Sequence, residues 1–116
     1  MKILILGADG YLGWSTTVAL HNDNHELVLI DNYSKRYYMR KLGKKPLTNI
    51  PKAESRLKLL NKNNRIYFHN IDCSVYSNML SVIKKHKPDA VIHFAELPSA
   101  PFSMLNDKYS WETIRN

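Results

Sequence analysis

The sequence is poor in cysteine, in long apolar runs and in clustered metal ligands. Its single cysteine, Cys73, excludes a disulfide within the chain and is typical of proteins from a reducing compartment. No apolar run approaches the ~18 residues of a membrane-spanning helix, and Met1 leads directly into an apolar run without a signal-peptide pattern. The five histidines show no ligand spacing with cysteine or carboxylates. We therefore expect a cytoplasmic protein with no membrane partner and no metal site.

Acidic residues are also scarce: the sequence has 10 Asp and Glu but 17 Lys and Arg, which gives a net charge of +7. Six of these cations fall within residues 35–45, where Tyr37 and Tyr38 are interleaved. Such a cluster can grip a nucleic-acid backbone and stack bases, form a solvated loop or helix face, or place Arg36 beside an anionic cofactor or substrate. Charged residues are mostly solvated, so a nucleic-acid partner is not expected.

Glycine is the third scarce residue, and three of the four glycines lie close together. Gly7, Gly10 and Gly13 form a GxxGxxG pattern between the apolar run 3–6 and a helix-like segment. In a dinucleotide-binding turn, Gly7 would make the turn, Gly10 would admit a pyrophosphate to the backbone, and Gly13 would let helix and strand pack closely. The pyrophosphate would meet N–H groups at the helix N-terminus. Because ordinary strand-to-helix turns also use glycine, the pattern alone indicates only a phosphate-binding turn.

Strand-like and helix-like segments alternate along the 116 residues, which predicts one α/β domain with a parallel sheet. The expected strands are residues 2–6, 27–30, 65–70 and 90–94, and the expected helices are residues 11–22, 53–61 and 75–86. Right-handed crossovers give the strand order 3-2-1-4, a truncated, Rossmann-like doubly wound parallel sheet. Residues 35–51 show little periodicity and are expected to form an irregular insertion.

Two further expectations concern the burial of side chains. Leu12, Thr16, Ala19 and Leu20 share one face of the first helix at spacings near 3.6, and we expect that face to be buried. His93 alternates into an apolar strand, and we expect it to pack in the core rather than to act as a catalyst.

The second strand ends at Asp31, about 24 residues after Gly7, which suits the spacing of a dinucleotide fold. A carboxylate at this position accepts hydrogen bonds from both ribose hydroxyls of adenosine. It would also repel a 2′-phosphate, so Asp31 predicts NAD rather than NADP. Arg36 favours the opposite choice, since a nearby arginine can accommodate that phosphate. Asp31-Asn32 is alternatively an ordinary turn after a strand.

Asp72 and Cys73 follow the third strand, where this fold passes the adenine ring. The Asp72 carboxylate can accept from the adenine amino group while the Cys73 backbone contacts the ring. Asp72 or Ser74 can instead cap the following helix, and both arrangements can hold together. The lips of the expected ligand crevice are residues 7–13 and 95–104.

Several segments together resemble the UDP-sulfoquinovose synthase family, a branch of the extended short-chain dehydrogenases that act on nucleotide sugars. The GxxGxxG spacing and Asp31-Asn32 are shared by the epimerases and dehydratases of that superfamily. Narrower similarity lies in Gly10-Tyr11-Leu12-Gly13-Trp14, His93-Phe94-Ala95-Glu96 and Ser99-Ala100-Pro101-Phe102-Ser103-Met104. Leu97 and Pro98 depart from the family, because they replace a glutamine and an arginine that could bind an anion.

The resemblance implies an activity and a set of binding residues. Enzymes of this family keep NAD bound, oxidise C4 of UDP-glucose, lose water across C5 and C6, add sulfite at C6 and return the hydride, giving UDP-sulfoquinovose. The implied cofactor-binding residues are Gly7, Gly10, Tyr11, Leu12, Gly13, Asp31, Asn32, Arg36, Asp72, Cys73, Phe94, Ala95 and Glu96. The implied substrate-binding residues, beside the sugar or the sulfite, are Ser99, Ala100, Pro101, Ser103 and Met104.

No catalytic residue is predicted within the chain. The Tyr-x-x-x-Lys pair of the superfamily lies beyond a fifth strand, and Tyr37 and Lys41, which have that spacing, lie far from the expected nicotinamide. We expect residues 1–116 to be the NAD-binding N-terminal part of an enzyme, inactive alone, with a bare fourth strand that promotes homodimers or aggregation. The alternatives are a sugar-nucleotide 4-epimerase or 4,6-dehydratase, and a non-catalytic nucleotide- or nucleic-acid-binding module.

Overall fold

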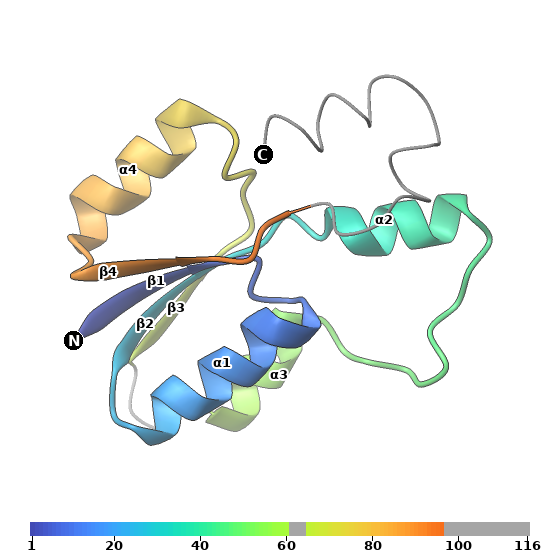
Figure 1. The fold of residues 1–116 in the computed structure, drawn as a ribbon, viewed down its shortest axis with the longest axis horizontal. Helices are drawn as coiled ribbons and strands as arrows, with labels where there is room; N and C mark the ends of the chain where they lie inside the picture. The colour runs from blue at the N-terminus through green and yellow to red at the C-terminus, as the bar shows by residue number, and fades with distance from the viewer. Residues whose placement is uncertain (61–64, 97–116) are drawn as a thin grey trace.

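The computed structural model describes residues 1–60 and 65–96, which form a parallel sheet with helices on both faces (Figure 1). Its elements are β1 (Lys2–Leu6), α1 (Tyr11–Asn22), β2 (Glu26–Ile30), α2 (Ser34–Lys41), α3 (Ala53–Leu60), β3 (Ile66–His69), α4 (Tyr76–His86) and β4 (Ala90–His93). The strand order is β3-β2-β1-β4, and every pairing is parallel. The predicted Rossmann-like fold and strand order are therefore confirmed.

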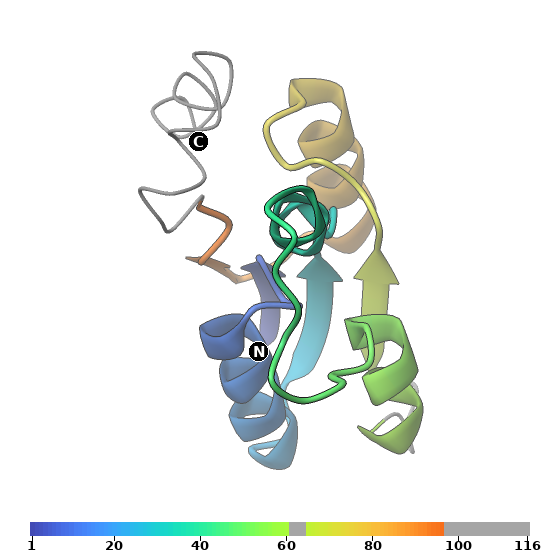
Figure 2. The same cartoon turned by 90° about the vertical axis from the view of Figure 1, so that its right-hand side faces the viewer.

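The helices are divided between the two faces of the sheet. Helices α1 and α3 cover one face and α4 covers the other, while α2 lies beyond the carboxyl ends of the strands (Figures 1 and 2). Alternate residues of each central strand enter opposite cores, so Ile5 and Leu29 face α1 and α3 while Leu4 and Val28 face α4. Strands buried on both faces must be apolar throughout, which explains why β1 and β2 read as continuous apolar runs.

The buried face of α1 differs from the expected one. Gly13 and Thr17 are its buried residues, whereas Leu12 is 58% exposed and Ala19 is exposed. The Thr17 hydroxyl donates to the carbonyl of Gly13 at 2.7 Å, which satisfies this polar group inside the helix. The expected stripe is wrong for Leu12 and Ala19, whereas Leu20 is partly buried and packs against the core. Close packing of α1 on the turn after β1 requires small residues at the contact.

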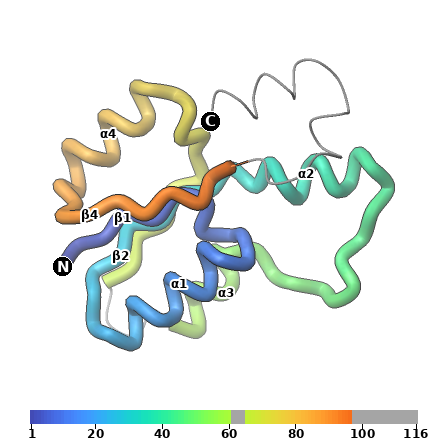
Figure 3. The backbone as a smooth tube through the Cα atoms, viewed as in Figure 1, coloured from blue at the N-terminus to red at the C-terminus, as the bar shows by residue number. Residues whose placement is uncertain are grey.

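Residues 35–51 are more regular than expected, because α2 occupies their first part. The turn before it is built by two side chains: Asp31 Oδ1 accepts from Tyr33 N at 2.7 Å, and Asn32 Oδ1 accepts from Ser34 N at 3.0 Å. Tyr38 then anchors the helix, since it is only 7% exposed. The stretch 42–52 has neither helix nor strand, and Figure 3 follows it along the outside of the molecule to α3.

The expectation that His93 packs in the core is wrong. Its side chain is exposed, as is that of Val91 two residues earlier, at 53%. In the described part of the chain β4 is the outer strand and pairs with β1 alone, so a single neighbour covers its side chains. Within residues 1–60 and 65–96, no helix has the length and apolar character needed to cross a membrane.

Two histidines meet between β3 and α4. The Nε2 atoms of His69 and His86 lie 2.8 Å apart, and His86 is buried in the last turn of α4. Burial lowers the pKa of His69, and so does the charge of Lys85; burial also lowers the pKa of His86, with further contributions from His69 and Lys85. The unfolded chain therefore binds protons at these sites more readily than the folded protein.

This histidine pair predicts a stability that depends on pH. Because both pKa values are lower in the folded state, their contribution is fully present above the unfolded value of about 6.5 and is lost as the pH falls below it. We expect the midpoint temperature of thermal unfolding to decrease when the pH is lowered from about 7.5 to about 5.5. The decrease should be smaller in His69→Gln, because this variant has one titrating group fewer. Equal pH dependence of the two proteins in calorimetry would contradict this prediction.

Candidate functional site

A cleft of about 1030 Å³ opens at the carboxyl ends of the strands. It is lined by the turn between β1 and α1, the end of β2 with the first turns of α2, the segment after β3 and the segment after β4. Ligands of parallel α/β sheets bind at this edge, where the strand order reverses between β1 and β4. The cleft therefore lies where the sequence placed the ligand crevice.

The turn between β1 and α1 and the first residues of α1, residues 7–13 together, form the glycine loop. Gly7 has φ +83°, and a Cβ there would lie 2.7 Å from the carbonyl carbon of Phe94. A Cβ at Gly13 would lie 2.0 Å from the carbonyl oxygen of Gly7, so only glycine fits. These contacts agree with the functions predicted for Gly7 in the turn and for Gly13 in close packing.

Gly10 is different, because the fold itself does not require it. Its backbone is extended, with φ −69° and ψ 169°, and a Cβ there would meet only the Gly7 carbonyl oxygen, at 3.4 Å. Gly10 is the N-cap of α1 and offers no side-chain cap, and no acidic residue occupies the first turn. The N-terminus of α1 thus presents backbone N–H groups to the cleft, an arrangement that favours an anion.

Asp31 lies at the end of β2, between the glycine loop and α2. Its Oδ2 accepts from Asp9 N at 2.8 Å and its Oδ1 accepts from Tyr33 N at 2.7 Å, so the carboxylate is held by backbone on both sides. Burial raises the pKa of Asp31, and the two N–H donors act in the opposite direction. Each oxygen has one donor from the protein, which leaves acceptor capacity for a diol.

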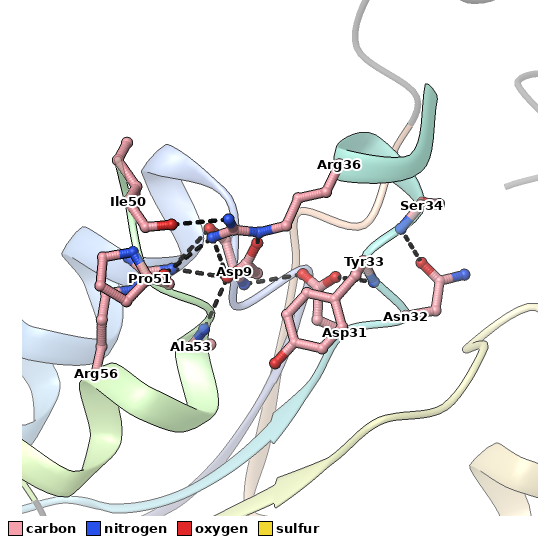
Figure 4. Close-up of polar contacts among 10 residues, drawn as sticks. All are labelled: Asp9, Asp31, Asn32, Tyr33, Ser34, Arg36, Ile50, Pro51, Ala53 and Arg56. Carbon is pink, nitrogen blue, oxygen red and sulfur yellow. Dashed lines mark hydrogen bonds and ion pairs between the residues drawn. The ribbon is translucent and has the colours of Figure 1, made fainter. Parts of the chain in front are cut away.

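Asp9 in the glycine loop is the centre of a network that sequence reasoning missed (Figure 4). Its carboxylate forms ion pairs with Arg36 and, at 2.8 Å, with Arg56, and it accepts from Ala53 N at 2.8 Å. Burial alone would raise the pKa of Asp9, but the hydrogen bond and charge of Arg36 with the Ala53 and Arg56 donors lower it overall. The network joins the glycine loop to α2 and α3.

Each arginine of this network also makes a contact of its own. Arg36 donates to the carbonyl oxygens of Ile50 at 2.8 Å and Pro51 at 3.0 Å, which fixes the end of the 42–52 stretch. The guanidinium carbon of Arg56 lies 4.2 Å from the centre of the Trp14 ring. Arg36 lines the cleft, but its bonds go to Asp9 and these carbonyls, and its place among the cofactor-binding residues stays a prediction.

Asp72 and Cys73 line the cleft beside Ile71, after β3. Asp72 Oδ1 accepts from the backbone N and the hydroxyl of Ser74, at 2.8 and 2.7 Å, so it closes a tight turn. The expectation that Asp72 or Ser74 caps α4 is wrong, because the N-cap is Val75 and no side chain caps this helix. Burial and the charge of Asp72 raise the pKa of the Cys73 thiol, which does not favour a nucleophilic thiolate.

The remaining predicted residues either line the cleft, are exposed near it, or lie outside the residues that the structure describes. Phe94, Ala95 and Glu96 follow β4 and line the cleft, and Phe94 N donates to the Leu6 carbonyl at 2.8 Å. Tyr11 and Leu12 are exposed at the start of α1, and Asn32 lines the cleft beside Asp31. The predicted substrate residues Ser99, Ala100, Pro101, Ser103 and Met104 lie outside the residues that the structure describes.

Several cleft residues had no predicted function. His93 is one of them, and the others of note are cations of α2 and of the stretch after it, Lys35, Arg40, Lys44 and Lys52. Tyr37 and Lys41 instead contact each other, with the Lys41 ammonium 5.0 Å from the centre of the Tyr37 ring, and neither is among the residues that line the cleft. The sequence did not predict α2, and without this helix it could not show which residues of the segment face the cleft and which, like Tyr37 and Lys41, do not.

A parallel sheet of order β3-β2-β1-β4, a glycine loop before α1 and an acid at the end of β2 define a dinucleotide-binding domain of the Rossmann type. The chain belongs to the NAD dependent epimerase/dehydratase family, whose sequence pattern matches residues 3–115. Membership of this family confirms the prediction of NAD as the cofactor.

The comparisons with individual proteins also agree with the resemblance noted in the sequence. The chain is 35% identical to UDP-sulfoquinovose synthase of Sulfolobus acidocaldarius over 100% of its length, and 31% identical to the chloroplastic enzyme of Spinacia oleracea over 99%. It covers only 30% and 24% of these relatives. A crystal structure of UDP-glucose-4-epimerase from Stenotrophomonas maltophila with bound NAD and formylated UDP-arabinopyranose superimposes with a TM-score of 0.70 and 26% identity, covering 98% of this chain and 30% of that one.

Proposed function

We propose that this chain is the cofactor-binding part of an NAD-dependent enzyme that modifies the sugar of a UDP-sugar. The observation that carries the proposal is Gly10, where the packing of the protein leaves room for a Cβ and the chain nevertheless has none. A bound pyrophosphate at the N-terminus of α1 explains this glycine, because it must approach the backbone closely.

The other residues of the cleft fit the remaining parts of NAD. Asp31 would accept from the hydroxyls of the adenosine ribose, Asp72 and the Cys73 backbone would contact adenine, and residues 94–96 would line the nicotinamide side. The cleft combines apolar lining with charged and polar groups, which suits a ligand that has both aromatic rings and phosphates. When bound, NAD would accept a hydride from the sugar and return it.

The particular reaction that we propose is the conversion of UDP-glucose and sulfite to UDP-sulfoquinovose through a 4-keto sugar. The names of the two relatives and the segments Gly10–Trp14 and Ser99–Met104 support it. A cytoplasmic location and a homodimer belong to the same proposal.

The alternative is a 4-epimerase or 4,6-dehydratase, because a solved UDP-glucose-4-epimerase shares the fold. Full-length protein that forms its product from UDP-glucose only when sulfite is added would favour the synthase, and the same turnover without sulfite would favour the alternative.

Binding of NAD tests the coarser proposal directly. We expect Gly10→Val to weaken NAD binding by at least ~100-fold in calorimetry, because the valine would occupy the place of the pyrophosphate. Gly43→Ala is the matched control: Gly43 has φ +65° and open space around it, so alanine there strains the backbone without touching the cleft. Unchanged NAD affinity in a folded Gly10→Val protein would contradict the proposal.

A further inference from the structure

More cations than acids line the cleft. The cations that line the cleft are Lys35, Arg36, Arg40, Lys44, Lys52 and Arg56. The acids that line the cleft are Asp9, Asp31, Asp72 and Glu96, and Asp9 and Asp31 lie next to each other. Cations around an adenosine ribose are typical of sites that accept the 2′-phosphate of NADP, which raises the question of how such a site would remain selective for NAD.

The Arg36 guanidinium is already engaged by other groups of the protein, which bears on the selectivity for NAD. Its Nε and Nη2 donate to the two carboxylate oxygens of Asp9, the latter at 3.0 Å, in a paired arrangement. Its remaining bonds go to the carbonyl oxygens of Ile50 and Pro51. Figure 4 shows the side chain reaching from α2 across to Asp9 and these carbonyls. A guanidinium held at both edges in this way is not free to turn to a phosphate.

Asp9 also holds the second arginine of the network. Arg56 Nη2 donates to Asp9 Oδ1 at 2.8 Å and to the Asp9 carbonyl at 3.0 Å. The Asp9 side chain is 8% exposed, so it is shielded from solvent while it neutralises charge from two guanidinium groups. Its own N–H donates to Asp31 Oδ2 at 2.8 Å, so the network directly adjoins the residue expected to bind the ribose.

We propose that Asp9 is a positioning residue for cofactor selectivity, which holds Arg36 in an ion pair and so withholds it from the 2′-phosphate of NADP. The inference rests on the proposed function, because it assumes that Asp31 faces the adenosine ribose. Asp31 repels a 2′-phosphate by its own charge, and Asp9 removes the nearby cation that would offset this repulsion. Selectivity for NAD then depends on two carboxylates that act by different means.

The test compares binding of 5′-ADP and 2′,5′-ADP, two fragments that differ only in the 2′-phosphate. In Asp9→Asn the amide keeps an acceptor for Ala53 N but cannot neutralise Arg36, so we expect the affinity for 2′,5′-ADP to rise about tenfold relative to that for 5′-ADP. In the double variant Asp9→Asn/Arg36→Gln the ratio should return to that of the unmodified protein. Asp9→Glu, which keeps the charge, serves as the control.

The outcomes separate the inference from the proposed function. If the ratio in Asp9→Asn is unchanged, or if Arg36→Gln does not reverse its rise, the inference is overturned although NAD binding stands. If the unmodified protein binds neither NAD nor 5′-ADP, the proposed function fails first. Should Asp9→Asn not fold, Arg36→Lys replaces it, because a lysine cannot make the paired contact; a ratio that stays unchanged in that variant also overturns the inference.

Discussion

Replacement of Gly13 by alanine is expected to destabilise the protein by about 3 kcal/mol or more, whereas alanine at Gly10 costs less than about 1 kcal/mol. The added Cβ at position 13 would lie 2.0 Å from the Gly7 carbonyl oxygen and 2.8 Å from its carbon. Both atoms belong to the backbone of the glycine loop, so α1 would have to move away from the sheet. At position 10 the nearest atom is 3.4 Å away, an ordinary contact.

Urea unfolding followed by circular dichroism measures this difference. Both variants add the same single methyl group, and both positions belong to the same loop, so each serves as the control for the other. Gly13→Ala should have a much lower midpoint than Gly10→Ala, or should be unfolded without urea. Similar midpoints for the two variants would mean that the close approach of Gly13 to Gly7 does not exist in the protein.

Replacement of Asp31 by arginine is expected to weaken NAD binding by at least ~100-fold, because hydrogen bonds to a charged group contribute about 1.5–3 kcal/mol each and two of them would be lost. The Asp31 oxygens already accept from Asp9 N and Tyr33 N, which aims the carboxylate at the cleft. Arginine would remove these acceptors and bring a third guanidinium close to Arg36 and Arg56. The binding loss should therefore exceed that of Asp31→Asn.

Asp31→Asn is the matched variant, because the amide has the same shape and keeps one acceptor. We expect an intermediate loss of NAD affinity from it with near-normal circular dichroism. Calorimetry of both variants against NAD gives the comparison. An affinity unchanged in Asp31→Arg would show that Asp31 is a turn residue and not a ribose ligand.

The order of the strands could be predicted because it depends on local patterns. β1 and β2 are covered on both faces, so each is an unbroken apolar run, and parallel strands joined by helices follow a handedness rule. The buried face of α1 could not be predicted in the same way. Hydrophobic periodicity identifies large apolar contacts, whereas the contact of α1 with the glycine loop depends on the small size of Gly13.

In the candidate site, too, residues at characteristic sequence spacings could be predicted, whereas contacts between residues far apart in the chain could not. Gly7, Gly10, Gly13 and Asp31 stand at characteristic spacings, so the sequence was sufficient to predict that they lie together at the cleft, while their contacts with a cofactor stay a prediction. The Asp9 network joins residues 27 and 47 positions apart, and Arg36 lies in α2, a helix that the sequence did not predict. No local pattern records such a pairing, and Arg36 was therefore predicted only as a residue beside an anionic cofactor or substrate. His93 was misplaced for another reason: the fourth strand was expected to be bare, yet the apolar character of its sequence was read as burial of His93.

β1 is synthesised before β2, β3 and β4, yet it lies inside the sheet that these strands form. β1 pairs with β2 on one side and with β4 on the other, and Lys2 N donates to Asp89, 87 residues later in the chain. A ribosome adds about 5–20 residues per second, so β1 must wait on the order of ten seconds for its second neighbour. The contacts of Gly7 with Phe94 cannot form before then. During synthesis the nascent chain therefore carries an apolar strand whose second edge stays unpaired until β4 has been added.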